Sequence, residues 1–450
     1  MSKVIKIKKG LDIKLKGKAE KVLHKVGTAA TYAVKPTDFT GITPKLLVKE
    51  GDAVKAGSAL FFDKYNSDVL FTSPVSGAVK KVVRGERRKI LEVVVEPNGK
   101  GEYESFKKAA PADLSREEII NNLQKSGLWP SIKMRPYSIV AKASDTPKAI
   151  FISGIDSAPL GVDYNFILQG KEKEFQAGID ALKKLTNGKI HLGIDADVEP
   201  CPAFVNVKNV EITKYTGRHP KGLVGTQIHK VDPINKGEVV WVVEPQKVVS
   251  IGRLFTEGRY DASKVVALAG SELKETGYFQ IIEGANIDSF AKERLASEHV
   301  RYISGSVLSG SRIEASGHMG YYDSLLTVIP EGDHYEFFGW IAPGFDKYSV
   351  SRTFFSWLNP KKEYIVDTNL KGGKRALMIT GAFEKVFPFD IFPMQLIKAT
   401  IIEDIDLMEK LGIYEVVEED FALCEFVDTS KTDIQAIVRN GLDLMIKEMS

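Results

Sequence analysis

Short apolar-alternating segments, separated by glycine and proline turns, constrain the N-terminal part of this chain most strongly. Gly51 and Gly57 supply turn residues on either side of one such segment, and Pro74 with Gly77 marks a returning strand. Turn residues at this spacing are typical of antiparallel hairpins and argue against helices. We therefore expect a small β unit over residues 1–102, with strands near 46–62, 69–83 and 89–96.

The predicted unit resembles the barrel-sandwich domains of biotinyl and lipoyl carriers, but the lysine that those carriers modify is displaced. In the carriers this lysine stands at a hairpin tip, eight residues before the proline of the returning strand. Eight residues before Pro74 is Asn66, and the only nearby lysine, Lys64, comes two residues too early. We predict a biotinyl/lipoyl-like barrel-sandwich hybrid without a modified lysine, adapted to another use.

Length and composition indicate a multidomain chain of soluble type. With 450 residues we expect about three to four domains of ~100–150 residues each. The hydrophobic content of 43% and the charged content of 27% are ordinary for globular proteins. No apolar run approaches the ~18 residues of a transmembrane helix, and the charged start MSKVIKIKKG is unlike a secretory signal. We expect neither kind of segment.

The cysteines and histidines give no metal or cluster motif. Cys201 and Cys424 are far apart, and neither has a C-x-x-C partner, which excludes a disulfide framework and a cysteine-ligated zinc or iron–sulfur site within this chain. We expect a reducing cytoplasm and a structural role for Cys424. The spacing of His191, His219 and His229 fits no metal-ligand pattern, so no metal site is predicted.

Charge is distributed unevenly along the chain. Residues 1–100 hold 21 Lys and Arg against 10 Asp and Glu, a net charge of +11, whereas residues 401–450 have a net charge of −9. One interpretation is simply solvated faces. The other is a basic end that faces anionic lipid or an acidic partner. Nucleic acid is not expected as a partner, since the basic residues lack interleaved aromatic residues and no nucleic-acid motif is present.

A linker region is predicted over residues 103–147. Ser115 followed by Glu118 forms the pattern of a capping box, and Gly127 is a typical helix stop, so we expect a helix between them. The remainder, 127–147, contains three prolines and is predicted to be irregular.

Residues 148–254 are expected to form a Rossmann-like α/β unit. Strand patterns at 148–157 and 189–195 flank a helical pattern at 173–188 that ends at Gly188. The loop after the first strand lacks a GxGxxG fingerprint, and Ile155 and Asp156 would obstruct a pyrophosphate. We therefore expect no flavin or dinucleotide in this unit. The run 219–237 does not follow the phosphate-binding P-loop pattern either.

The last two predicted units are a β-grasp (SLBB-like) module at 255–335 and an aromatic-rich and helical region at 336–450. Residues 301–333 are dense in Gly and Ser between strand patterns, and aromatic residues crowd 336–358. A C-terminal helical bundle is indicated by two apolar periodicities, one at 397, 401, 405 and 408 before Gly412, the other at 434, 438, 442 and 445. The overall class is α+β multidomain. Carboxylates at 403–420 are interpreted as a solvated face, so no catalytic residue is assigned.

Several distinctive stretches together resemble one protein family over almost the full length. They are GITP (41–44), FISGIDSAPL (151–160), HPKGLVGTQIH (219–229), RYISGSVLSG (301–310), FGWIAPGFDKYSVSRTF (338–354) and EEDFALC (418–424). The chain is similar to the A subunits of the bacterial Na⁺-translocating NADH:quinone oxidoreductases. The family is similar in plan to the flavin- and cluster-bearing subunits of complex I, and the resemblance implies that it has lost those cofactors.

The resemblance further implies a peripheral protein on the cytoplasmic face of the bacterial inner membrane, bound chiefly to the membrane-embedded B subunit. NADH, flavins and an iron centre would be handled by other subunits, and the quinone would bind at a shared site. The expected role is to scaffold and shape the quinone-reducing end of a sodium-pumping respiratory complex. Alternatives are a stand-alone carrier, a soluble flavoprotein, or an assembly module without quinone contact.

Two irregular segments combine apolar side chains with hydrogen-bond donors, as a quinone ring with polar carbonyls requires. They are KPTDFTGI (35–42) and LWPSIKMRPY (128–137), in which Arg135 or Tyr137 could donate to a quinone carbonyl. The alternative is that Trp129 and Tyr137 merely pin the linker onto the core. The predicted quinone-proximal residues are Thr37, Phe39, Ile42, Trp129, Arg135 and Tyr137.

Overall fold

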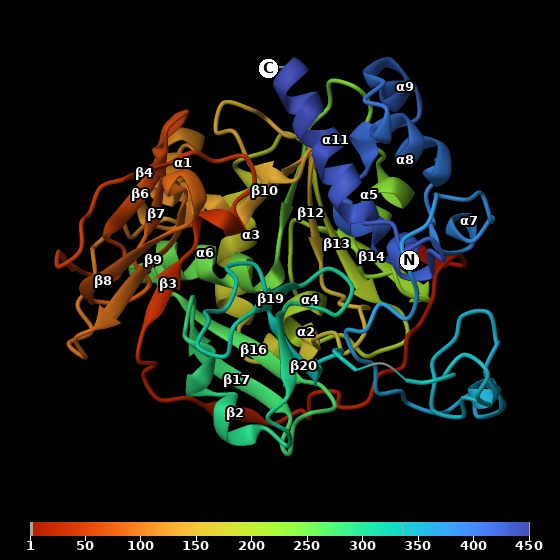
Figure 1. Ribbon diagram of the computed structural model, residues 1–450. Coiled ribbons are helices and arrows are strands. Elements are labelled where there is room, and N and C mark those ends of the chain that lie inside the picture. Colours follow the sequence, from red (N-terminus) through yellow and green to blue (C-terminus); the bar gives the residue numbers. More distant parts are fainter. Residues whose placement is uncertain (1–2, 335, 450) are drawn as a thin grey trace.

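The computed structural model describes residues 3–334 and 336–449, and four β-sheets organise them, with helices gathered towards the C-terminal end (Figure 1). Residues 1, 2, 335 and 450, which the predicted domain ranges include, lie outside the described residues. Single-turn 3-10 helices connect many elements, among them η2 (Glu86–Arg88), η3 (Pro111–Asp113), η4 (Trp129–Ser131), η5 (Ile287–Ser289) and η6 (Lys292–Arg294).

Two of the sheets pack face to face into an N-terminal barrel. One has the order β3-β9-β8-β5 and the other β4-β6-β7. Their strands are β3 (Tyr32–Val34), β4 (Pro44–Leu46), β5 (Ala53–Val54), β6 (Ala59–Asp63), β7 (Asn66–Thr72), β8 (Gly77–Arg84) and β9 (Ile90–Pro97). Phe61 and Phe71 from one sheet and Val93 from the other are almost fully buried, as the alternation of apolar residues requires.

The β6–β7 hairpin corrects one expectation about Lys64. The ladder pairs Phe61 with Phe71 and Phe62 with Leu70, so its centre falls on Asn66 as counted from the sequence. A register shift then pairs Asp63 with Asn66, which leaves Lys64 and Tyr65 as an exposed two-residue tip. Lys64 is therefore at the turn, because the irregularity shortens the loop.

A seven-stranded sheet has the order β1-β14-β13-β12-β15-β10-β11, and its first five strands are parallel. The strands are β1 (Lys3–Ile7), β10 (Ile132–Arg135), β11 (Ile139–Val140), β12 (Ala149–Ser153), β13 (Lys189–Asp195), β14 (Glu211–Gly217) and β15 (Val240–Val243). The first strand of the chain thus pairs with β14 and not with a barrel strand, while the antiparallel pair β10–β11 extends the opposite edge.

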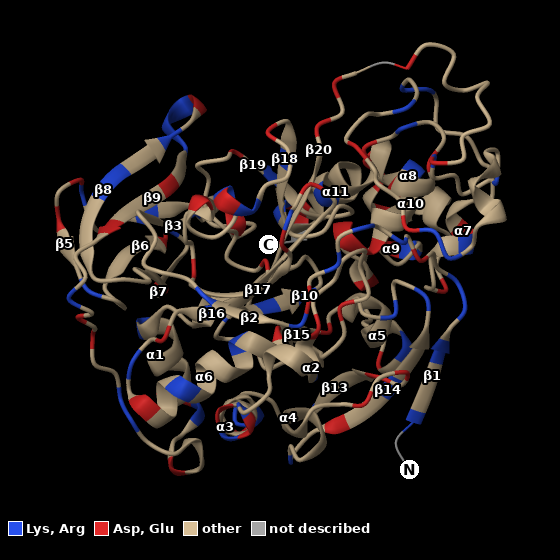
Figure 2. Ribbon diagram, turned by 90° about the horizontal axis from the view of Figure 1, so that it is seen from below, with Lys and Arg blue, Asp and Glu red and all other residues tan. Residues whose placement is uncertain are grey.

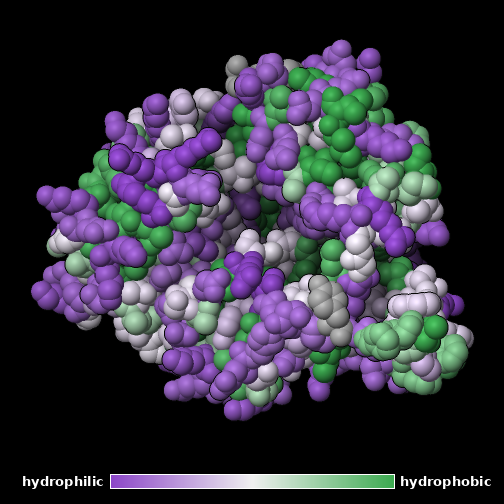
Figure 3. All heavy atoms as spheres, viewed as in Figure 1, coloured by the Kyte–Doolittle hydropathy of each residue, from purple (hydrophilic) through white to green (hydrophobic). Residues whose placement is uncertain are grey.

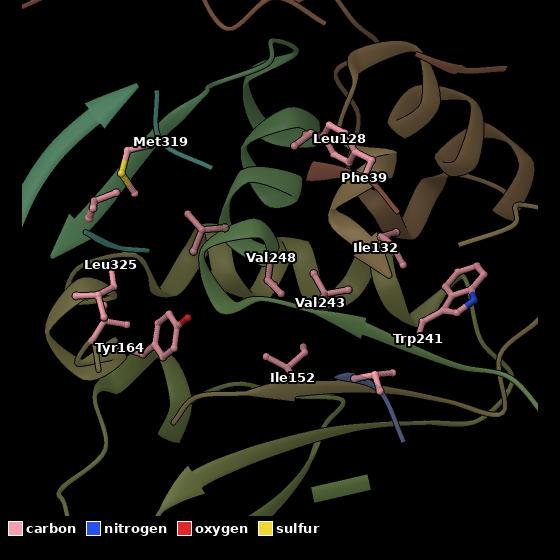
Figure 4. Packing of buried hydrophobic residues seen from close by; sticks show 14 of the residues in the cluster. Phe39, Leu128, Ile132, Ile152, Tyr164, Trp241, Val243, Val248, Met319 and Leu325 are labelled. Atoms are coloured by element: carbon pink, nitrogen blue, oxygen red, sulfur yellow. The ribbon is translucent and has the colours of Figure 1, made fainter. Parts of the chain in front are cut away.

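Helices cover both faces of this sheet, and the side chains of β12 show why. Ile150 and Ile152 point into the main core, where α3 and α6 pack against each other, whereas Phe151 points to the other face and joins Ile228 of α5. The helices of this part are α1 (Arg116–Ser126), α2 (Tyr164–Ile167), α3 (Glu172–Lys183), α4 (Pro202–Val205), α5 (Val224–Val231) and α6 (Pro245–Glu257). Figure 4 shows Ile152, Val243 and Val248 within that main core.

Local signals in the sequence fix one helix start but not every helix end. The capping box at the start of α1 is confirmed, since Ser115 Oγ accepts from the Glu118 amide and Glu118 accepts from the Ser115 amide. Gly127 adopts the left-handed conformation that ends this helix. In contrast, α3 ends at Lys183 and not at Gly188, because Thr186 donates to Pro147 O and holds the next turn against the sheet.

A six-stranded sheet with the order β19-β18-β20-β16-β17-β2 forms the third unit. Its strands are β2 (Leu23–Lys25), β16 (Ser263–Ala269), β17 (Gly277–Ile282), β18 (Val300–Ser304), β19 (Ser311–Ile313) and β20 (Leu325–Pro330). β2, from the N-terminal part of the chain, lies parallel to β17 and completes one edge. The N-terminal residues therefore link this sheet, the barrel and the seven-stranded sheet.

The C-terminal part contains α7 (Phe383–Val386), α8 (Pro393–Ile401), α9 (Ile405–Lys410), α10 (Ala422–Val427) and α11 (Ile434–Met449), with η8 (Ile413–Glu415) and η9 (Glu418–Phe421) between them. The α11 periodicity is confirmed, since residues 434, 438, 442 and 445 are fully buried. The single helix expected before Gly412 is wrong: Glu403 takes a positive φ and Asp404 caps a new helix, so α8 and α9 are separate. Within residues 3–334 and 336–449, no helix has the length and apolarity needed to cross a bilayer.

Candidate functional site

The two segments selected from the sequence lie side by side. Gly41, in the loop after η1 (Pro36–Asp38), packs directly against Ile139 of β11, since a Cβ on Gly41 would stand 3.3 Å from Ile139 Cγ2. Figure 4 shows Phe39 next to Leu128, from the second segment. The structure thus brings residues 35–42 next to the second segment, 128–137, and to β11, which follows it, at the junction between the barrel and the seven-stranded sheet. Residues 35–42 and 128–140 are called the junction below.

Phe39 is a core residue of this junction. Its side chain is 3% exposed, and its ring centroid lies 4.6 Å from that of Phe71 and 4.9 Å from that of Tyr321. The contacts join the barrel to the loop before β20, and they bury a large apolar surface at the centre of the molecule. Phe39 therefore packs domains together in this structure and does not line an open wall.

Trp129 is buried in the same way. It is fully inaccessible, its indole Nε1 donates to Ala141 O at 2.7 Å, and its ring meets Trp241 edge-on at 5.5 Å. A buried tryptophan needs such a partner for its N–H. The alternative interpretation from the sequence, that Trp129 pins the linker to the sheet, agrees with these contacts.

Arg135 is occupied by carboxylates of its own chain. Its guanidinium donates to Asp420 at 2.8 Å and to Glu419 at 3.0 Å, both in η9, and only 2% of the residue is exposed. Burial raises the pKa of Asp420 to about 6 even though Arg135 opposes the shift. The guanidinium of Arg135, predicted above as a donor to a quinone, thus holds the C-terminal helices to β10.

Of the six predicted quinone-proximal residues, Thr37 is exposed, and Ile42 and Tyr137 are half-buried. Tyr137 has a φ of 82°, and its carbonyl accepts from Arg439 of α11 at 2.7 Å. Burial raises the pKa of its phenol. These three side chains, and not the three buried ones, are what a ligand or partner can reach here.

A buried polar cluster beneath Phe39 was not foreseen from the sequence. Glu283 accepts from Lys247 Nζ at 2.5 Å and from Tyr260 Oη at 2.8 Å. Lys247 Nζ also lies 3.5 Å from the ring centroid of Tyr321, and burial lowers the lysine's pKa to about 8. No motif marks these residues, because they come from α6, the strand ends and a loop that meet only in the folded chain.

The cavity at this junction is small. It is about 20 Å³ in volume and is bordered by residues that include Lys35, Asp38, Phe39, Tyr260 and Glu283. That is enough for about one water molecule, which needs some 10–15 Å³. A quinone ring does not fit there in this conformation, so a quinone would have to bind on the outer side of the junction or across an interface.

The carboxyl ends of β12 and β15 form the point where strand order reverses, which is where open α/β sheets bind nucleotides. In this chain the position is filled by protein. Glu244 accepts from Tyr164 Oη at 2.8 Å and from Ser324 Oγ at 2.6 Å. Asp156 is half-buried in the loop after β12 and accepts from the amides of Ala158 and Val162. A phosphate here would meet two half-buried carboxyl groups.

The remaining titratable groups form no metal centre among the residues that the structure covers. Neither Cys201 nor Cys424 has a nearby thiol, both are buried, and burial raises the pKa of each. His219 Nδ1 and Ser157 Oγ share a hydrogen bond of 3.0 Å, and burial lowers the pKa of His219 to about 4. Across those residues, no three His, Cys, Asp or Glu side chains are grouped as metal ligands.

Comparisons with known proteins agree on one family. Residues 5–98 match the NqrA N-terminal barrel-sandwich hybrid domain, residues 114–260 the NqrA second alpha/beta domain and residues 265–315 the NQRA C-terminal domain. The chain is therefore a mixed α+β protein with a barrel-sandwich domain followed by an α/β domain and the family's C-terminal domain.

Relatives match over almost the whole chain. The A subunit of the Na(+)-translocating NADH-quinone reductase of Neisseria meningitidis serogroup A is 38% identical over 452 residues, which is 99% of this chain and 100% of the relative. The same subunit of Pasteurella multocida and that of Hahella chejuensis are each 38% identical with equal coverage. Among solved structures, an NAD⁺-reducing [NiFe]-hydrogenase chain aligns with 75% of this chain and with 62% of its own length. The identity is 11% and the TM-score is 0.38, a similarity too weak to bear on function.

Proposed function

The chain belongs to the family of the A subunits of Na⁺-translocating NADH-quinone reductases, and we propose that it is a cofactor-free scaffold at the quinone-reducing end of such a complex. It is accordingly one subunit of an NADH:quinone oxidoreductase. In this proposal NADH, flavins and an iron centre belong to other subunits. The chain contributes shape, rigidity and part of the quinone surroundings.

The observation that carries the cofactor-free role is the filled strand-reversal point. In this proposal the α/β domain is Rossmann-like, so a nucleotide phosphate would approach the ends of β12 and β15, where the strand order reverses. Here Asp156 and Glu244 occupy that place, and Tyr164 closes it from α2. Anionic phosphate next to two half-buried carboxylates is unfavourable. These contacts support a domain that keeps its fold for assembly without binding a nucleotide.

The C-terminal helices support the scaffolding role. In this proposal they act as a helical bundle fastened across the α/β domain by ion pairs at several points. Besides Arg135 with Asp420, His229 of α5 contacts Glu415 at 2.7 Å, and Lys236 contacts Glu409 at 2.8 Å. A chain whose domains are fixed to one another in this way can hold the neighbouring subunits in one geometry.

The quinone-proximal surface in this proposal is the accessible side of the junction formed by residues 35–42 and 128–140. Thr37 and Tyr137 offer hydroxyl groups, and Ile42 offers an apolar side chain. Phe39, Trp129 and Arg135 would act from behind, because they fix the two segments in position. The site would be completed by the membrane partner, since the junction cavity alone is too small for a quinone.

The partner is chiefly the membrane-embedded B subunit, and the chain sits peripherally on the cytoplasmic face of the bacterial inner membrane in this proposal. The N-terminal net charge of +11 supports such a placement, because it attracts anionic headgroups or acidic loops. The tip of the β8–β9 hairpin is one exposed basic part of this region, with Arg84, Arg87, Arg88 and Lys89.

The proposal is tested by quinone kinetics of an assembled complex that carries Ile42→Ala and Tyr137→Phe. The apparent KM for quinone should rise several-fold, while NADH oxidation by an artificial electron acceptor stays unchanged. Val205→Ala, half-exposed on α4, is the matched control. Unchanged quinone kinetics would favour a pure assembly module, and a yellow isolated chain would favour the flavoprotein alternative.

A further inference from the structure

Residues 336–358, here named the aromatic segment, expose large apolar side chains to solvent. Phe337 is 89% exposed, Trp340 72% and Ile341 68%, and Phe345, Phe355 and Leu358 are each more than half exposed. Hydrophobic residues gather on this protrusion at the lower right of Figure 3. Contiguous exposed apolar surface of this kind marks a contact with another apolar body.

Some polar groups of the aromatic segment face inward and hold the loop together, although Asp346, Ser351 and Arg352 are exposed. Lys347 Nζ donates to Gly339 O and pairs with Glu336, both at 2.5 Å. Ser356 is 4% exposed and donates to Lys347 O at 2.5 Å. These bonds close the loop around a polar interior. Since the interior is polar, the aromatic rings are left on the outside.

The base of the aromatic segment is fixed to the rest of the molecule. The Tyr348 ring lies 5.2 Å from that of Tyr364 and 5.7 Å from that of Phe426 in α10. Tyr364 in turn donates its amide to Lys14 O at 2.8 Å. The exposed rings are therefore presented at a defined place on the surface.

Charged side chains of both signs accompany this apolar surface. Arg352 and Lys361 are exposed on or beside the aromatic segment, and so are Glu336 and Asp346. In Figure 2 the segment and the basic tip of the β8–β9 hairpin both project from the upper side of the molecule. One side of the protein thus combines the exposed aromatic rings of one projection with the clustered positive charge of another.

We propose that the aromatic segment inserts into the interfacial layer of an anionic phospholipid bilayer. Trp and Phe rings flanked by Lys and Arg are the side chains that favour the headgroup region, where rings enter the acyl boundary and cations meet phosphates. A protein partner is the other candidate, since aromatic residues and Arg are enriched at protein–protein interfaces. The basic hairpin tip that projects on the same side favours the bilayer, and the vesicle experiment distinguishes the two. The inference rests on the proposed function, in which the chain lies against a membrane, and it names the contact that holds it there.

The four tryptophans make the test specific. Trp129 and Trp241 are fully buried, whereas Trp340 and Trp357 are exposed in the aromatic segment, so a change in emission on membrane binding reports the segment. The full chain is titrated with vesicles of phosphatidylcholine containing one quarter phosphatidylglycerol. Co-sedimentation, a blue shift and quenching by brominated lipid are expected, with weaker binding at high salt.

The variant Phe337→Ser/Ile341→Ser keeps both reporter tryptophans and should bind these vesicles at least tenfold more weakly. Tyr65→Ser/Phe392→Ser removes equally exposed rings elsewhere and should bind like the unmodified chain. Absence of vesicle binding, or binding that the first variant does not weaken or that the control weakens equally, would overturn the proposal. Quinone kinetics of the assembled complex test the proposed function separately, because isolated vesicles contain no other component of the complex.

Discussion

Arg135 Nη1 lies 2.8 Å from Asp420 Oδ2, and neither side chain is more than 3% exposed. The pair joins β10 to η9 across 285 residues of sequence, so it ties the α/β domain to the C-terminal helices. Gly225 of α5 lies against the same pair, since a Cβ there would stand 2.3 Å from Asp420 Oδ1 and 2.5 Å from Arg135 Nη1. Three elements therefore meet at one buried charge pair.

Replacing Arg135 with Ala should lower the free energy of unfolding by about 3–5 kcal/mol, because Asp420 is left buried without its partner. The loss should be smaller at pH 5 than at pH 8. Burial raises the pKa of Asp420 above its unfolded value, and a protonated Asp420 tolerates burial better. Urea titrations at both pH values measure this effect.

The matched control is Arg312→Ala, which removes an exposed ion pair: Arg312 Nη2 lies 3.9 Å from Glu314 Oε1. In this control the free energy of unfolding should fall by less than about 0.5 kcal/mol. Equal losses in the two variants would show that the buried pair has no special role.

Replacing Gly225 with Ala should destabilise the same junction by about 1–3 kcal/mol, the usual cost of overpacking. The new methyl group would displace Asp420 or Arg135. Helix propensity alone predicts a gain, since Ala is a better helix former than Gly. A stability equal to or above that of the unmodified chain, measured by thermal unfolding, would contradict this close approach.

The fold was predictable where a short stretch of sequence contains the whole pattern that determines an element. The capping box at Ser115 and the four buried positions of α11 were readable because their partners are three or four residues away. The pairing of β1 with β14 was not, because alternation marks a strand but says nothing about a distant neighbour, and here Lys3 pairs with Thr213. The break at Glu403 was missed because the apolar period continues through it.

The candidate site was predictable only in part, for a similar reason. The sequence located the two junction segments but could not tell exposed from buried members, so Arg135 was assigned as a free donor while its carboxylates lie near residue 420. The Lys247–Glu283 pair has no motif at all. Buried ion pairs between domains depend on tertiary geometry that local patterns do not contain.

His219 should make the chain less stable as the pH falls. Its ordinary pKa is about 6.5, and burial lowers the folded-state pKa to about 4. Its stabilising contribution is complete above the unfolded pKa, and it is lost as the pH falls from about 6.5 towards 4, by about 2 kcal/mol at pH 5. Urea titrations at pH 7 and pH 5 measure the difference.

The control for this titration is His219→Asn, whose amide can still share a hydrogen bond with Ser157 but does not titrate. The variant should lose less stability between pH 7 and pH 5 than the unmodified chain. An identical pH dependence in both proteins would remove His219 as the cause.

Lys64 should carry neither biotin nor lipoate, although it lies at the exposed tip of the β6–β7 hairpin. The centre of the ladder is Asn66, so the lysine stands two residues from the position that modifying enzymes recognise in the carriers. Intact-mass measurement after expression in a host with both ligases should give the mass of the bare chain. A mass increase matching either group would support the carrier alternative.

The central claim is that this chain, without a redox cofactor of its own, forms part of the quinone surroundings. A photoreactive quinone bound to the assembled complex tests it most directly, with the labelled peptides identified by mass spectrometry. We predict label within residues 35–42 or 128–140, where Thr37, Ile42 and Tyr137 are accessible. Label confined to other subunits, with none on this chain at saturating quinone, would contradict the account.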